Sequence, residues 1–415
     1  MTNKQSYLSE AIQGFGKFTV FSVREILSGS RVFWSLVIGL SICIGLGLVA
    51  YMKQFDDGLI TTALRDQMSW GFYIGNFTFL VGVAAAAVLL VIPAYVYNWK
   101  PIKEVVILGE ILAISAIIMS MLFVLVDVGR PDRVWHLIPG IGRLNVPSSM
   151  LGWDVLVLNG YLLLNLAIVT SLLVNLFLGK EPNKKIFYPL VLLSIPAAIG
   201  IHTVTAFLYN GFPARPFWNA AILAPRFLAS AFCSGPALLL MLMQLLRRFT
   251  DFEIKDSAIW KVAELMAYAM FLNLFLLGAE VFKEYYSATE HLIHMKYMFQ
   301  GIDGHRAIAP WMWLSVVSST IAFLLFLIPR TRTHPVTLNI GCILIFIGVY
   351  LEKGMGLVIS GMTPDTLGEI YEYLPTWNEL FVAQGIFAIG SLVFIFLVKV
   401  ATPIMLEYNS RESAD

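Results

Sequence analysis

The most chemically suggestive part of the sequence is a polar stretch between two long apolar runs. Asp127 ends the first run, Asp154 lies near the start of the second, and Arg130 lies between them. A charged side chain at the centre of a bilayer costs about 2.5–3.5 kcal/mol on the insertion scale. Carboxylates at or inside a membrane edge are therefore candidates for function. We interpret this stretch as part of a proton-coupled redox site at one face of a membrane.

Further polar side chains lie inside the neighbouring apolar runs. Asp154 and Tyr161, which follow Trp153, are seven residues apart and therefore share one face of a helix. His202 and Arg226 lie in the next two runs. Histidine is the side chain that changes charge most readily near neutral pH. These four side chains are an acid, a phenol, an imidazole and a guanidinium, and they lie at similar depth. This grouping favours a shared functional site over four separate structural side chains.

Two acidic residues lie on the other side of the expected membrane from Asp127 and Asp154. Two interpretations are open for them. Glu110 and Glu264 are either first-turn residues whose side chains reach the lipid headgroups or the start of a proton path. Such a path would continue through Asn273 and Glu280.

The remaining charged residues at the run ends also fit a purely interfacial role. Lys283 lies three residues after Glu280 and is able to pair with it. We expect Lys283, Glu352 and Lys353 to be side chains whose charged ends reach the water interface.

The composition indicates that helices in a membrane carry these residues. The 415-residue chain is 58% hydrophobic and only 13% charged, against about 45–50% and about 25% in soluble domains. A net charge of +1 gives no indication of nucleic-acid binding. We therefore expect an all-α polytopic membrane protein that contacts lipid.

A spanning helix needs about 20 mostly apolar residues, and ten runs meet this requirement. They cover residues 32–52, 70–97, 105–126, 152–178, 186–208, 218–246, 258–282, 309–328, 336–359 and 379–402. The chain then divides into an N-terminal segment (1–31), a membrane domain (32–402) and a C-terminal tail (403–415). Tryptophans at the run ends match an interfacial belt. Residues 15–27 are weakly amphipathic and fit a helix on the membrane surface.

The larger share of the 28 lysines and arginines lies in the two terminal segments and in the loops after even-numbered runs. The positive-inside rule therefore predicts that both termini are cytoplasmic. The second and sixth runs are similarly rich in small residues, as close helix packing in lipid requires. We expect two parallel four-helix bundles, formed by runs two to five and six to nine, with runs one and ten peripheral.

The sequence offers few ligands for a metal, a haem or an iron–sulfur cluster. The three cysteines are isolated and form no C-x-x-C motif. Among the six histidines, only His202 lies deep in a run, whereas a transverse haem b needs paired axial ligands. His291 and His294 have the spacing of a metal site but lack a clear third ligand. We therefore expect no metal, haem or cluster in this chain.

The sequence resembles the NrfD/PsrC family of integral membrane quinone-binding subunits. The residues that carry the resemblance are D-V-G-R-P-D-R-V-W-H at 127–136, S-S-M-L-G-W-D at 148–154 and P-R-F-L-A-S-A-F-C-S-G-P-A at 225–237. Ten runs and E-K-G-M-G-L-V-I-S-G at 352–361 resemble the ten-span branch of the family. The similarity covers residues 30–400.

The resemblance implies a subunit of a respiratory complex that binds menaquinol near the outer face. It implies four partners: an extracytoplasmic ferredoxin-like iron–sulfur subunit, a multihaem cytochrome c, a haem-b membrane protein and a cytoplasmic iron–sulfur protein. Electrons from the quinol would pass directly to a partner's iron–sulfur cluster. It also implies that the cofactor is menaquinone and that this chain carries no haem or metal.

Within that frame, local chemistry suggests roles for the candidate residues. Asp154 and His202 would hydrogen-bond the quinone oxygens or accept their protons, and Tyr161 would orient the ring. We expect Arg226 to keep Asp154 charged. Asp127 and Arg130 would connect the site to the outer surface.

Two other functions remain compatible with the sequence. A secondary transporter also has many spans, a repeat and intramembrane acids, although its site lies near the midplane. A structural anchor for other subunits predicts that Asp154 and His202 can be replaced with little loss of turnover.

Overall fold

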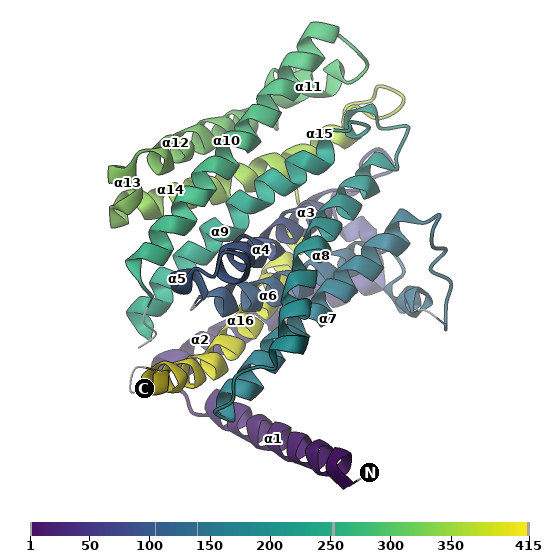
Figure 1. Ribbon diagram of the computed structural model, residues 1–415. Helices are drawn as coiled ribbons and strands as arrows, with labels where there is room; N and C mark the ends of the chain where they lie inside the picture. Colours follow the sequence, from purple (N-terminus) through teal and green to yellow (C-terminus); the bar gives the residue numbers. More distant parts are fainter. Residues whose placement is uncertain (1, 104, 139, 251–253, 413–415) are drawn as a thin grey trace.

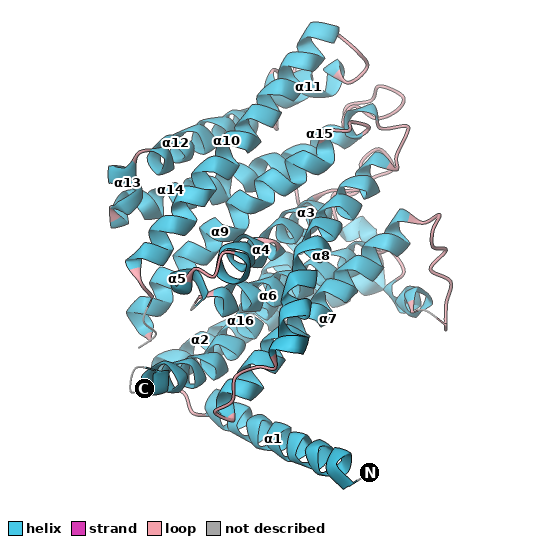
Figure 2. Cartoon of the chain, in the orientation of Figure 1, coloured by secondary structure: helices cyan, strands magenta, loops and turns pink. Residues whose placement is uncertain are grey.

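Within the part of the chain that the structure describes, ten helical segments are long and apolar enough to cross a membrane, as the sequence predicts. The computed structural model describes residues 2–103, 105–138, 140–250 and 254–412, and over these residues it contains helices and loops but no strand (Figure 2). The spans are α2 (Arg31–Asp57), α3–α4–η2 (Phe72–Val96), α6 (Val106–Asp127), α7 (Met150–Phe177), α8 (Lys184–Asn210), α9 (Leu223–Phe249), α10 (Asp256–Ser287), α12 (Ala309–Leu327), α14–η5–α15 (Pro335–Met362) and α16 (Trp377–Glu412). The protein is a multi-pass integral membrane protein.

The other helices connect the spans or flank them. They are α1 (Thr2–Leu27), η1 (Leu59–Thr61), α5 (Lys100–Lys103), η3 (Pro131–Leu137), η4 (Pro216–Trp218), α11 (Leu292–Phe299) and α13 (Pro329–Thr333). Helix α1 packs against α7 and α16, where Phe21 meets the ring of Phe177 at 4.9 Å. Helix α16 continues through Glu412, beyond the end that hydropathy indicates.

The contacts between helices form the two predicted four-span groups. In the first bundle α3, α6, α7 and α8 pack in chain order, and in the second α9, α10, α12 and α14 do the same (Figure 1). Helix α3 packs against α9 and makes the seam between the bundles. Helices α2 and α16 pair with each other at the edge, and α16 also contacts α6.

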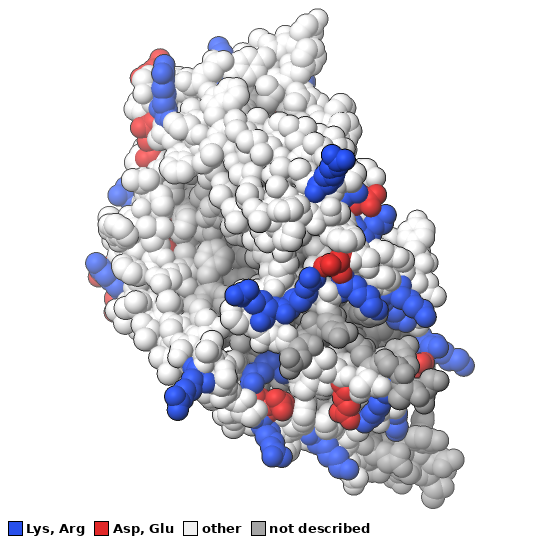
Figure 3. All heavy atoms as spheres, turned by 90° about the vertical axis from the view of Figure 1, so that its left-hand side faces the viewer, with Lys and Arg blue, Asp and Glu red and all other residues white. Residues whose placement is uncertain are grey.

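The two faces of the helix array differ in their connections. Helices α1, α5 and α13 and the C-terminal end of α16 lie at one face, which we call the terminal face (Figure 1). The segments 58–71, 128–149, 211–222, 288–308 and 363–376 connect spans at the opposite, long-loop face. Figure 3 views the side on which α13 and the C-terminus lie, and lysine and arginine predominate there over aspartate and glutamate.

Two spans are interrupted, and the sequence analysis did not predict either interruption. The second span breaks at Ala85, between α3 (Phe72–Ala84) and α4 (Ala86–Val91). The ninth span changes from α14 (Pro335–Val349) to the π-helical segment η5 (Tyr350–Gly356) and then to α15 (Leu357–Met362). Single π-helical turns often mark functional sites, since they turn side chains away from the regular helical register.

Helices α2 and α16 approach each other through glycine. A Cβ atom placed on Gly47 would lie 2.7 Å from the Cα of Gly385 and 2.9 Å from the carbonyl oxygen of Phe381. These are backbone atoms that cannot move aside. Small residues at such crossings let helix backbones come close in lipid, where packing rather than the hydrophobic effect drives association.

We expect Gly47→Val to separate α2 from α16 and to cost roughly 1–3 kcal/mol, the usual range for overpacking. Gly45→Val is the matched control, because a Cβ atom at Gly45 meets nothing within 4 Å. The melting temperature of the purified protein in detergent should fall for the first variant only. Equal melting temperatures would contradict the close glycine contact.

Candidate functional site

The first bundle buries an acidic side chain between α7 and α8. Asp154 and Thr205 are 2% and 0% exposed, and the Thr205 hydroxyl donates to the Asp154 carboxylate at 2.8 Å. One turn further along α8, the Tyr209 hydroxyl contacts the Thr78 hydroxyl of α3. The carboxylate therefore lies inside the bundle with one protein donor, in the half of the membrane near the long-loop face.

His202 lies on the same helix as Thr205 and is fully buried. Its Nδ1 atom lies 2.7 Å from the carbonyl oxygen of Ala198, and its Nε2 atom is buried and has no hydrogen-bond partner among the described residues. A carbonyl oxygen only accepts, so Nδ1 carries the proton and Nε2 is left as an acceptor. An unpaired buried acceptor is costly and suits a ligand that brings a hydroxyl donor.

Tyr161 and Glu110 lie near the break in the second span. The Tyr161 hydroxyl is 3.5 Å from the carbonyl oxygen of Ala84, the last residue of α3. Glu110 is 1% exposed, and neither of its carboxyl oxygens has a hydrogen-bond partner in the part of the chain that the structure describes. Glu110 therefore does not reach the headgroups, and the interpretation as a first-turn interfacial residue is wrong for it.

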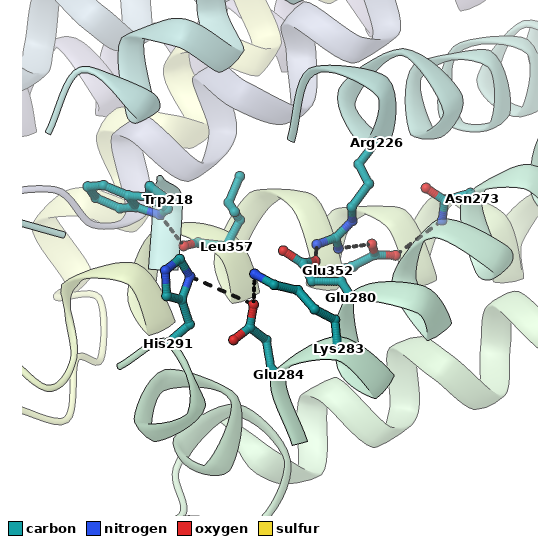
Figure 4. Close-up of polar contacts among 9 residues, drawn as sticks. All are labelled: Trp218, Arg226, Asn273, Glu280, Lys283, Glu284, His291, Glu352 and Leu357. Atoms are coloured by element: carbon teal, nitrogen blue, oxygen red, sulfur yellow. Dashed lines mark hydrogen bonds and ion pairs between the residues drawn. The ribbon is translucent and has the colours of Figure 1, made fainter. Parts of the chain in front are cut away.

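Arg226 does not pair with Asp154, so that expectation is wrong. Its guanidinium forms ion pairs with Glu280 of α10 and with Glu352 of η5, the latter at 2.6 Å (Figure 4). Asn273 donates to the other oxygen of Glu352 at 3.2 Å. The rotation of α9 about its axis directs Arg226 into the second bundle, and that rotation depends on tertiary packing rather than on depth.

The π-helical segment turns Glu352 and Lys353 inward. Both residues are 4% exposed, so the expectation that they reach the interface is wrong. The Lys353 ammonium donates to the carbonyl oxygen of Phe227 at 2.9 Å and lies 4.3 Å from the centre of its ring. With Arg226 and Glu280 they form a group of two positive and two negative side chains, which we call the buried charge cluster. Balanced charges reduce the penalty of removing each ion from water.

A small cavity opens against the buried charge cluster. It has a volume of about 10 Å³ and is lined by Leu223, Arg226, Phe227, Ser230, Glu352, Lys353 and Leu357. This is room for about one water molecule. Four of the lining residues carry polar side chains, which can supply the partners that a buried water needs. A quinone ring does not fit this cavity.

One expectation about the seventh span is also wrong, because Lys283 pairs with Glu284 at 2.8 Å rather than with Glu280. Glu264 differs from the buried Glu110, since its side chain is partly exposed and pairs with Lys261 at 3.3 Å. Asn273 and Glu280 do come together at the buried charge cluster. Asn273 donates to Glu352, and Glu280 pairs with Arg226.

The candidate residues at the long-loop face make separate contacts. Arg130 pairs with Asp132 at 2.9 Å, which raises the pKa of Arg130 and lowers the pKa of Asp132 through their hydrogen bond. Asp127 has one buried carboxylate oxygen for which the described residues provide no hydrogen-bond partner. The indole of Trp153 donates to the carbonyl oxygen of Pro147 at 3.0 Å. Among the described residues, Arg130 therefore pairs with Asp132, and no contact connects Arg130 to Asp127.

With this geometry established, comparison with known proteins gives a family. The family description "Polysulphide reductase, NrfD" matches residues 60–363, which include the seam, the Asp154 site and the buried charge cluster. The chain belongs to the NrfD family.

Curated relatives of this NrfD protein are membrane subunits of several oxidoreductases. It is 26% identical to a putative dimethyl sulfoxide reductase membrane subunit of Halobacterium salinarum, over 87% of this chain and 88% of that one. It is 23% identical to the Hdr-like menaquinol oxidoreductase integral membrane subunit of Archaeoglobus fulgidus, over 91% and 95%. It is 24% identical to the menaquinone reductase integral membrane subunit of Nitratidesulfovibrio vulgaris, over 84% and 86%.

The NrfD chain holds a further buried carboxylate that the sequence analysis missed. Glu379 is 0% exposed and accepts hydrogen bonds from the backbone N–H groups of Ala63 and Thr376, at 2.9 and 2.8 Å, and from the Tyr373 hydroxyl. Thr376 in turn accepts from the N–H of Glu379. This reciprocal pair is a capping box, and T-W-N-E before the last apolar run was its visible sequence signal.

His291 and His294 do not share a metal site in the part of the NrfD chain that the structure describes. No group of three or more histidine, cysteine, aspartate or glutamate residues comes close enough there to hold an ion. The Nδ1 atom of His294 lies 2.8 Å from the carbonyl oxygen of Ser360 and anchors α11 on α15. Burial lowers the pKa of His294, so it is neutral at physiological pH.

Proposed function

We propose that this NrfD protein is the menaquinol-binding membrane subunit of a respiratory oxidoreductase complex. The observation that carries the proposal is the polar group of the first bundle: a buried carboxylate, Asp154, and a buried imidazole acceptor, His202 Nε2. Relatives from Archaeoglobus fulgidus and Nitratidesulfovibrio vulgaris carry menaquinol or menaquinone in their names.

The proposed chemistry follows from the residues of the first bundle. Menaquinol oxidation releases two electrons and two protons. His202 Nε2 accepts a hydrogen bond, and then a proton, from one quinol hydroxyl, and Asp154 accepts the other proton. Thr205 positions the Asp154 carboxylate through its 2.8 Å hydrogen bond. Tyr161 orients the ring, and the electrons leave to the iron–sulfur cluster of a partner subunit.

The proposal includes an orientation and a proton path. The long-loop face lies outside and both termini lie in the cytoplasm, in line with the lysine and arginine on the side shown in Figure 3. A path for protons uses Glu110 and Glu264 on the cytoplasmic side and Asn273 and Glu280 within the membrane. Glu264 takes part at the entrance, since its side chain is partly exposed.

The finer form of the proposal concerns the complex. The ten-span pattern supports a subunit of the DsrP type, in a complex that takes part in sulfur metabolism. Its partners are then an extracytoplasmic iron–sulfur subunit like DsrO, a multihaem cytochrome like DsrJ, a haem-b membrane subunit like DsrM and a cytoplasmic iron–sulfur subunit like DsrK.

A menaquinol analogue added to the purified complex tests this function. We expect the haems or clusters of the partner subunits to become reduced only when the quinol is present. Purified partner subunits without this chain provide the control and should stay oxidised. If the intact complex ignores the quinol, a secondary transporter becomes the better account of the buried charges.

A further inference from the structure

The helix α10 carries two buried carboxylates one turn apart: Glu280 belongs to the buried charge cluster, and Glu284 lies nearer the long-loop face. Glu280 and Glu284 are 4% and 1% exposed. Side chains four residues apart on a helix have Cβ atoms about 5–6 Å from each other. Buried acids in a membrane segment are costly in free energy. Two buried acids on one face of a helix are therefore candidates for a proton relay.

Glu284 connects the interior with the surface. Its carboxylate accepts from the Lys283 ammonium at 2.8 Å and from the Thr289 hydroxyl at 2.9 Å, and it lies 3.8 Å from Nδ1 of His291 (Figure 4). The Lys283 side chain is 56% exposed and the His291 side chain 19% exposed. A fully buried carboxylate thus touches two groups that reach water at the long-loop face.

The inner end of this row contains buried polar atoms without a hydrogen-bond partner among the described residues. They are Nε of Arg226, which lines the water-sized cavity, and Oδ1 of Asn273, a residue that donates through its Nδ2 atom to Glu352. Arg226, Ser230, Glu352 and Lys353 line the cavity. A water there can make the two to four hydrogen bonds that buried waters require. The unpaired atoms and the cavity therefore indicate a hydrated charge cluster rather than a dry salt bridge.

We propose that these groups form an outward proton route through the second bundle, from Glu352 to Glu280, then to Glu284 and to His291. This proposal rests on the proposed function, because oxidation of the quinol supplies the protons. A proton taken up by Glu352 weakens its ion pair with Arg226. It passes to Glu280, the other carboxylate paired with Arg226, then to Glu284, then to Nδ1 of His291, and leaves to the outer water. Each carboxylate returns to its charged form and pairs again with Arg226 or Lys283.

Proton release by the intact complex in oriented liposomes tests the route. Menaquinol is added, a pH-sensitive dye outside reports protons, and reduction of the partner's haems reports electrons. We expect Glu284→Gln to slow proton release about 10²-fold, the contribution typical of a positioned acid–base group. Glu284→Asp should restore release, and Glu290→Gln should leave it unchanged, since Glu290 is exposed in the same loop.

The outcomes separate the route from the proposed function. Proton release by Glu284→Gln at the wild-type rate, while electrons still flow, overturns the route and leaves the quinol site intact. A wild type that transfers no electrons from menaquinol contradicts the function and the route together. If Glu284→Gln fails to assemble, His291→Gln gives the same test. We expect His291→Gln to slow proton release about as much as Glu284→Gln. Proton release at the wild-type rate in His291→Gln would overturn the route.

Discussion

Arg226→Gln is expected to destabilise this NrfD protein by about 3–5 kcal/mol, the usual cost of removing one partner from a buried ion pair. The change leaves the carboxylates of Glu280 and Glu352, each 4% exposed, without their guanidinium. Lys353 remains as the only cation of the buried charge cluster, against two anions. The melting temperature and the yield of assembled complex in detergent measure the effect.

A double variant separates loss of charge balance from loss of packing. Arg226→Met combined with Glu280→Gln removes one positive and one negative charge and leaves Glu352 with Lys353. We expect this variant to recover most of the stability that Arg226→Gln loses, because no excess charge stays buried. If Arg226→Gln melts like the wild type, the cluster does not hold the second bundle together.

Asp154→Asn and His202→Ala are each expected to slow menaquinol oxidation by about 10²-fold or more, the range for removal of a positioned acid or base. Asparagine keeps an oxygen that accepts from Thr205 but does not take up a proton, so the fold of α7 and α8 should persist. Alanine removes the unpaired Nε2 acceptor of His202. Stopped-flow reduction of the partner's haems by a menaquinol analogue measures the rate.

An exposed and a partly exposed residue on the same helices serve as controls for these variants. Asn159→Ala on α7 and Thr203→Val on α8 remove polar groups whose described hydrogen bonds go only to their own helix. Both should oxidise menaquinol at the wild-type rate. Near-normal rates for Asp154→Asn and His202→Ala as well would indicate that the chain is an anchor or binds its quinone elsewhere.

The spans could be predicted because hydrophobic length is a property of each segment alone. A run of about 20 apolar residues has to cross the bilayer whatever it packs against. The pairing of Arg226 could not be predicted in this way. Its depth follows from the sequence, but its neighbour depends on the rotation of α9 against α10 and η5, which is set by the whole bundle.

The inward position of Glu352 and Lys353 depends on a local irregularity. Hydropathy treats residues 336–359 as one regular helix, whereas η5 inserts a π-helical segment that turns both side chains to the interior. The visible sign of this irregularity in the sequence was the pair of glycines at 354 and 356. In the structure, Gly354 lies against Gly75 of α3. The capping box at Thr376 and Glu379 shows the reverse case, since T-W-N-E is a local pattern that can be found without a structure.

Photoaffinity labelling of the intact complex with an azido-menaquinone analogue tests the central claim most directly. The account predicts that labelled peptides come from α7 and α8, around Asp154 and His202, and that excess menaquinone suppresses the label. Label confined to α9, α10 and the ninth span, or label that menaquinone does not displace, would contradict a quinone site in the first bundle.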